Sequence, residues 1–208
     1  MRVTQIAELS KTRNKVYIEQ EFAFVLYKGE LRLYHIREGE EISEENYRTI
    51  MEKVLPKRAK LRAMNLLKSR EYTTMQLRTK LEQGGYPKAV VEEALSYVAS
   101  FHYIDDLRYA VSFITCNETN RSHRRIEQDL QTKGISREII EKAWRKWEEE
   151  GGSQNELAMI QKLLEKRHYV AEQADYKERQ RTCAFLVRKG FSGEMIRKAM
   201  SEDDMGLE

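Results

Sequence analysis

Hydrophobic positions follow two different periods along the chain. Within residues 1–42 the apolar side chains are mostly aromatic or β-branched and fall in short runs, which is typical of β-strands. The strongest runs are residues 16–18, 22–26 and 31–36, and the last of these alternates between two faces. We therefore predict a small sheet with one wet face and a hairpin turn at residues 28–30.

From Ser43 onward the apolar residues recur every three or four positions, which predicts helices. Ser43 precedes two glutamates, and this order indicates a capped helix start at which carboxylates favour the positive dipole end. Pro56 should kink or restart that helix, because proline lacks a backbone N–H. A capping-box pattern from Thr73 to Gln76 opens a further helix.

One pattern occurs three times without gaps, at residues 81–95, 130–144 and 186–200. In each copy a leucine is followed four residues later by glycine and then by an apolar residue. The glycine suits the left-handed backbone that ends a helix, and the apolar residue folds back onto the last turn. An amphipathic helix precedes each copy, so the repeating unit is three helices of about 45–55 residues.

The sequence therefore predicts a mostly α-helical chain. Three tandem three-helix repeats would form an elongated curved array with a small β-rich extension at its N-terminus. We assign residues 1–56 to a β-hairpin or meander plus a helix, and residues 57–104, 105–150 and 151–204 to the three repeats. The sheet should pack on the first repeat, and cap it, through Phe22, Phe24 and Leu26.

Composition narrows the class of protein. Of the 208 residues, 40% are hydrophobic and 34% are charged, a balance that suits an array with much exposed surface. No apolar run approaches the roughly 18 residues of a membrane helix, and the first residues lack a signal-peptide core. The two cysteines, Cys116 and Cys183, are too far apart in sequence to indicate a metal or disulfide framework. We expect a cytoplasmic chain without membrane association.

Motifs for catalysis and cofactor binding are missing. Neither a glycine-rich phosphate loop nor a nucleophile elbow occurs in the sequence. The pair Asp105 and Asp106 is more simply explained as the cap of a helix beginning near Leu107 than as an acid–base pair. We therefore expect neither an enzyme nor a bound cofactor. We also expect no metal, because none of His35, His102, His123 and His168 has a partner at metal-ligand spacing.

Basic side chains gather at three places. Seven basic residues and no acid lie between Lys53 and Arg70, a second group opens the middle helix of the second repeat, and a third lies within residues 177–189. Any one group is explained by a solvated helix face. Recurrence in successive repeats instead favours a basic stripe that suits a phosphate backbone or an acidic protein groove. The candidate contact residues are Lys57, Arg58, Arg62, Arg70, Arg121, Arg124, Arg125 and Lys133.

Several segments resemble the RecX family. They are residues 70–77, the helix end at 81–85 and, above all, the run Tyr-Ile-Asp-Asp-Leu-Arg-Tyr-Ala at 103–110. The second repeat also matches around Lys133, and the resemblance covers about residues 59–200. His102 stands where the family usually has glycine, which affects only the local helix ending.

The resemblance implies a regulator that binds RecA–DNA filaments in their helical groove. Such a protein suppresses RecA ATPase and strand exchange, promotes filament disassembly, and so modulates recombination, DNA repair and the SOS response. The implied partners are the RecA filament and, weakly or through RecA, single-stranded DNA. The oligomeric state stays open, although a repeat array with capped ends can be a monomer.

Two other classes of function stay open. A stand-alone nucleic-acid-binding module would bind DNA tightly and in a salt-sensitive manner without RecA, although the net charge of only +3 argues against strong affinity. A helical adaptor for an unrelated protein would expose a large apolar patch.

Overall fold

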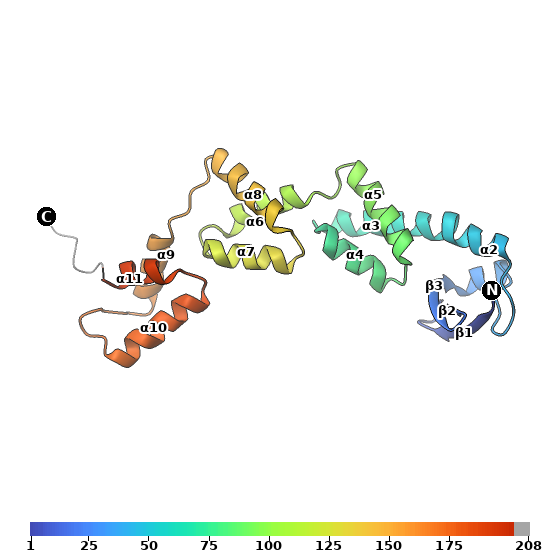
Figure 1. The fold of residues 1–208 in the computed structure, drawn as a ribbon, viewed down its shortest axis with the longest axis horizontal. Coiled ribbons are helices and arrows are strands. Elements are labelled where there is room, and N and C mark those ends of the chain that lie inside the picture. The colour runs from blue at the N-terminus through green and yellow to red at the C-terminus, as the bar shows by residue number, and fades with distance from the viewer. Residues whose placement is uncertain (202–208) are drawn as a thin grey trace. The chain divides into compact units, whose positions relative to one another are not determined.

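The computed structural model describes residues 1–201. The chain divides into two compact units, the first spanning Met1–Asp105 and the second beginning at Asp106. The first unit contains a sheet and the first helical repeat, and the second unit contains the other two repeats (Figure 1). The prediction of a mostly helical chain with three three-helix domains and a small N-terminal sheet is confirmed.

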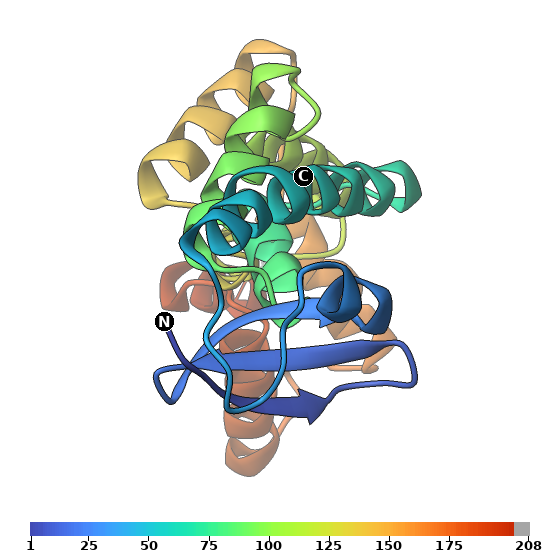
Figure 2. The same cartoon turned by 90° about the vertical axis from the view of Figure 1, so that its right-hand side faces the viewer.

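The N-terminal sheet has three antiparallel strands, β1 (Val3–Glu8), β2 (Arg13–Ile18) and β3 (Glu21–Tyr27), in the order β1-β2-β3. They run side by side in Figure 2. The turn between β2 and β3 lies at Glu19 and Gln20, which both have positive φ, at 52° and 71°. Sequence reasoning missed β1 because only its first residue, Val3, is fully buried and the strand shows no clean alternation.

The predicted hairpin at 28–30 and the predicted strand at 31–36 are wrong. Residues Lys28–Leu33 form helix α1 instead. The carboxylate of Glu30 accepts the backbone N–H of Tyr27 at 2.8 Å, which is the reciprocal bond of a capping box and favours a helix start over a turn. The alternation of Leu31 and Leu33 therefore reflected a short, mostly exposed helix rather than a strand.

The first repeat consists of α3 (Leu55–Ser69), α4 (Thr74–Gln83) and α5 (Lys88–Ser100). Before it, α2 (Glu44–Thr49) passes through the π-helical turn Ile50–Val54 into α3. Pro56 lies in the first turn of α3, where its missing N–H is tolerated, and the helix continues from the π-helical turn into α3 without a break. The predicted caps are confirmed: Ser43 Oγ accepts the Asn46 N–H at 3.1 Å, and Thr73 and Gln76 form the capping box.

One hydrophobic core joins the sheet to the first repeat. Phe24 and Leu26 from β3 are fully buried in the same cluster as Leu77 and Leu81 from α4. Of the three side chains predicted to make this contact, only Phe22 is largely exposed, at 43%. The sheet thus packs on the repeat as expected; its role as a cap stays a prediction.

The second unit holds two further repeats with separate cores. The second repeat is α6 (Asp106–Asn117), α7 (His123–Thr132) and α8 (Arg137–Glu149), and its core includes Ile114, Leu130 and Trp144. The third is α9 (Glu156–Lys166), α10 (Tyr176–Arg188) and α11 (Gly193–Ser201), and its core includes Ile160, Leu186 and Phe191.

The repeated helix ending is the same in all three repeats. Gly85, Gly134 and Gly190 have φ of 81°, 85° and 93°, values that glycine adopts without the steric cost a side chain would add. In each repeat the apolar residue after the glycine donates its N–H to the leucine carbonyl five positions earlier, at 3.2–3.4 Å. This is the bond that the Schellman motif requires. His102 also adopts the left-handed conformation, with φ of 55°. The chain after α5 therefore has the same backbone conformation that glycine provides at the other helix ends.

Candidate functional site

Arg58 holds the first repeat to the sheet. Its guanidinium pairs with Glu30 and donates to the Val25 carbonyl at 3.2 Å, and it lies 4.7 Å from the centre of the Tyr27 ring. Only 20% of its side chain is exposed. These contacts hold the Arg58 guanidinium inside the molecule, so they connect α3 with β3 and α1 rather than presenting a charge to a partner.

The other predicted contact residues of the first unit lie at the surface. Lys57 and Arg62 are exposed and form no hydrogen bond or ion pair with any described residue. Arg70 lies over the Tyr72 ring at 4.4 Å. Burial raises the pKa of the Tyr86 phenol, and the positive charges of Arg58 and Arg62 oppose that rise.

Polar contacts join the second and third repeats. Ser122, the buried N-cap of α7, donates its hydroxyl to the Lys189 carbonyl at 2.9 Å and accepts the Arg125 N–H at 3.3 Å. The Gln154 amide donates to the carbonyls of Glu118 and Arg121 at 2.7 and 2.8 Å. The two cores do not merge, so this joint is held by hydrogen bonds rather than by a shared apolar layer.

Gly190 allows the joint to close. A Cβ atom at this position would lie 2.5 Å from Ser122 Oγ and 3.2 Å from the Arg125 backbone nitrogen. The end of α10 therefore approaches the start of α7 more closely than any residue with a side chain would allow. The same glycine both ends α10 and makes room for the contact.

A basic cleft opens at this joint. It has a volume of about 520 Å³. One wall comes from α7 and the turn before it, and the other wall comes from the C-terminal end of α10. Figure 1 shows α7 and α10 in the second unit. The lining residues are Asn120, Arg121, Arg125, Phe185, Arg188 and Lys189.

One carboxylate organises a wall of the cleft. Asp129 accepts from Arg121 at 2.5 Å and pairs with Arg125 at 3.2 Å, while only 17% of its side chain is exposed. A shared carboxylate lets two guanidinium groups stay side by side, because it offsets their mutual repulsion. On the other wall, Lys189 lies over the Phe185 ring at 5.6 Å and Arg188 forms no ion pair with any described residue.

The contact residues predicted in the second repeat differ in whether they line this cleft. Arg121 and Arg125 line the cleft, whereas Arg124 is exposed on α7, is not part of the cleft lining and makes no ion pair with any described residue. The Lys133 ammonium and the Arg121 guanidinium both lie over the Phe113 ring, at 5.2 and 5.6 Å from its centre.

Arg188 and Lys189 were noticed in sequence as part of a basic group but were not predicted as contact residues. Their signal was available, because they immediately precede the repeated glycine. What the sequence did not indicate is that this helix end meets the start of α7.

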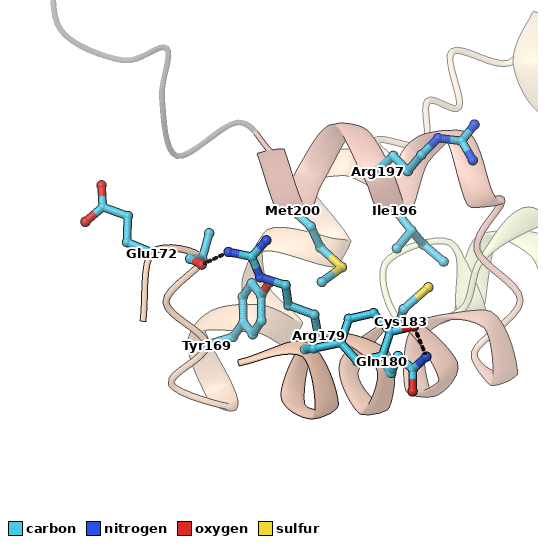
Figure 3. Close-up of a pocket in the computed structure, with 10 residues that line it drawn as sticks. Tyr169, Glu172, Arg179, Gln180, Cys183, Ile196, Arg197 and Met200 are labelled. Atoms are coloured by element: carbon cyan, nitrogen blue, oxygen red, sulfur yellow. Dashed lines mark hydrogen bonds between the residues drawn. The ribbon is translucent and has the colours of Figure 1, made fainter. Parts of the chain in front are cut away.

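A larger pocket of about 640 Å³ lies within the third repeat, between α10, α11 and the loop before α10 (Figure 3). Its apolar floor includes Cys183, Ile196 and Met200. Two polar groups at its edge are engaged within the molecule, because Arg179 donates to the carbonyls of Ala171 and Ala174 and Gln180 donates to the Tyr176 hydroxyl. Its lining holds two cationic side chains, Arg179 and Arg197, against four in the basic cleft.

The described residues give no sign of a metal site or a membrane span. Among them no group of three His, Cys, Asp or Glu side chains is placed to hold a metal ion. None of the helices within this part of the chain is both long enough and apolar enough to cross a bilayer.

Comparison with known proteins decides the family. Models of the first, second and third three-helix domains of RecX match residues 59–97, 105–143 and 154–200. A "Regulatory protein RecX" from Caldanaerobacter subterraneus subsp. tengcongensis is 30% identical over 203 residues, which cover 97% of this chain and 99% of the relative. This chain belongs to the RecX family. A further "Regulatory protein RecX", from Clostridioides difficile, is 23% identical over 204 residues.

Solved RecX structures have the same fold. One crystal structure of regulatory protein RecX aligns with a TM-score of 0.63 at 24% identity, covering 97% of this chain and 99% of that one. RecX from Lactobacillus salivarius aligns with a TM-score of 0.61 at 20% identity and covers 74% of this chain and 99% of that chain. The family match spans the range over which the sequence resembles RecX, so that resemblance is confirmed.

Proposed function

We propose that this chain is a cytoplasmic regulator that binds RecA–DNA filaments and inhibits RecA ATPase and strand exchange. In this role it modulates recombination and DNA repair as a monomeric, non-enzymatic protein. One observation carries the proposal: all three RecX domains occur in order, and a RecX relative aligns along its whole length.

The surface described above supports a binding role. A filament partner carries phosphates and acidic side chains, and both are attracted to fixed, exposed cations. The basic cleft supplies such cations on a joint held by several hydrogen bonds. Arg62 and Arg124 add exposed charges without internal ion pairs among the described residues.

The test is RecA-catalysed ATP hydrolysis on single-stranded DNA, titrated with this protein, beside its DNA binding in the absence of RecA. We expect inhibition at concentrations well below those that coat the DNA. No inhibition together with salt-sensitive DNA binding would contradict the proposal and favour a stand-alone nucleic-acid module, a second candidate that the basic cleft itself favours.

Charge reversal then tests the surface. Arg62→Glu and Arg124→Glu change exposed side chains that pair with no described residue, so both variants should fold normally. Each should weaken RecA inhibition, because the surface would lose an attractive charge and gain a repulsive one. Full inhibition by both variants would remove these two residues from the contact surface.

A further inference from the structure

We propose that the basic cleft between the second and third repeats is a phosphate-binding site that holds the backbone of a single-stranded nucleic acid. The inference deepens the proposed function and rests on it for its biological setting. It assigns the contact to Arg121 and Arg125 on one wall and to Arg188 and Lys189 on the other.

Convergence of charge is the first argument. Four cationic side chains from two repeats border one volume of about 520 Å³, and like charges gathered in this way repel one another unless an anion or solvent separates them. Asp129 offsets part of the charge on the α7 wall. Arg188 has no ion pair among the described residues, so the α10 wall keeps its excess positive charge.

The identity of the anion follows from the donors that remain. Arg121 and Arg125 share the Asp129 carboxylate and both line the cleft, and each guanidinium has further N–H groups beyond the one that contacts Asp129. A phosphodiester group has a tetrahedral arrangement of oxygens and accepts from donors on several sides, and arginine matches it in a two-pronged geometry. The Asn120 amide adds a neutral donor at the rim.

Two backbone N–H groups at the start of α7 are already used inside the molecule. The Arg125 N–H is taken by Ser122 Oγ, and the His123 N–H is taken by a carboxylate oxygen of Glu156 at 2.7 Å. The proposed site therefore uses the four side chains rather than these two backbone groups. Because two walls belong to different repeats, the site exists only while the joint is closed.

The experiment measures binding of the full chain to a fluorescein-labelled oligothymidylate by anisotropy, over a series of salt concentrations. The cleft variant Arg188→Gln/Lys189→Gln is compared with Lys177→Gln/Arg181→Gln. The control removes two exposed charges from the same helix but from outside the cleft. We expect the cleft variant to lose about tenfold in affinity and to lower the salt slope by roughly one to two, and the control to change far less.

Three results would overturn the inference. Equal loss in both variants would mean that only overall charge matters. A second such result would be that inorganic phosphate displaces the oligothymidylate completely, while chloride at the same ionic strength does not, and that the cleft variant binds DNA as the wild type does. The cleft would then bind a free anion rather than a nucleic acid. Unchanged DNA binding by the cleft variant with lost RecA inhibition would assign the cleft to an acidic protein surface. If the wild-type chain does not inhibit RecA, the proposed function is wrong, but the oligothymidylate measurement still tests whether the cleft binds DNA.

Discussion

At the scale of single residues, neighbours of identical chemistry have different roles. Arg58 and Arg62 lie one helical turn apart in the same basic group. Arg58 is mostly buried and bound to Glu30 and the Val25 carbonyl, whereas Arg62 is exposed and makes no ion pair with any described residue. A sequence shows the charge of both, but the direction of each side chain depends on which element lies opposite.

Gly190 provides the sharpest prediction at this scale. In Gly190→Ala the new methyl group meets Ser122 Oγ at 2.5 Å in a backbone with φ of 93°. Both the clash and the left-handed backbone destabilise the variant, so we expect a loss of about 2–3 kcal/mol in the free energy of unfolding. Urea denaturation followed by circular dichroism, which reports the helices of the third repeat as well as the second, measures this loss.

Gly151→Ala is the matched control for Gly190→Ala. Its φ is 91°, but a methyl group there would meet nothing within 4 Å. We expect only the backbone cost of about 1 kcal/mol. If both variants lost the same stability, the close approach of α10 to α7 would contribute nothing measurable.

At the scale of elements, most helix ends could be predicted because their signals are local. Ser43, Thr73 and Ser136 cap the helices that follow them, and the repeated glycines end the helices before them. Ser122 also caps a helix, but its hydroxyl additionally reaches Lys189 in another repeat. Ser122 therefore both caps α7 and holds the third repeat against the second.

Replacing Ser122 by alanine should therefore cost more than replacing an ordinary cap. Ser122→Ala loses the bond to the Arg125 N–H and also leaves the Lys189 carbonyl without its partner at the joint. We expect a loss of about 2–3 kcal/mol, against about 1 kcal/mol for Ser136→Ala, which caps α8 at an exposed position. Urea titrations of both variants provide the comparison.

Hydrogen exchange locates the effect of Ser122→Ala. Amides at the start of α10 and in α9 should keep their protection, while those at the start of α7 and around Phe191 should exchange faster, because these flank the lost bonds. Equal stability of the two serine variants, with unchanged exchange at Phe191, would show that the hydrogen bond across the joint is dispensable.

At the scale of the whole molecule, the chain has separate cores rather than one. The sheet and the first repeat share a cluster, and the second and third repeats each have their own. Both tryptophans, Trp144 and Trp147, lie in the core of the second repeat. Tryptophan fluorescence therefore reports the second repeat, whereas circular dichroism reports the helices of both units.

This distribution of tryptophans makes the independence of the two units testable. Phe24 is fully buried between the sheet and the first repeat, so Phe24→Ala should destabilise the first unit by about 3–5 kcal/mol. We expect the unfolding transition seen by circular dichroism to split or shift, while the fluorescence midpoint in urea stays unchanged. Phe22→Ala, at a site 43% exposed, should change neither signal appreciably. A fluorescence midpoint that moved with Phe24→Ala would show that both units unfold together.

The sequence by itself determined the elements whose signals are local. Helix caps, the three glycine endings and the buried faces of the repeats follow from hydrogen bonding and periodicity within about a dozen neighbouring residues. The RecX family was recognisable from the same segments. The one strong local error, a strand at residues 31–36, arose because the alternation of a short exposed helix resembles that of a strand.

Only the tertiary structure decided which charges act together. Arg125 and Arg188 are far apart in sequence, and they share a cleft because the end of α10 docks against Ser122. Arg58 is used inside the fold because β3 and α1 lie against it. Such contacts depend on how distant elements pack, and side-chain periodicity within one helix carries no information about the surface of another.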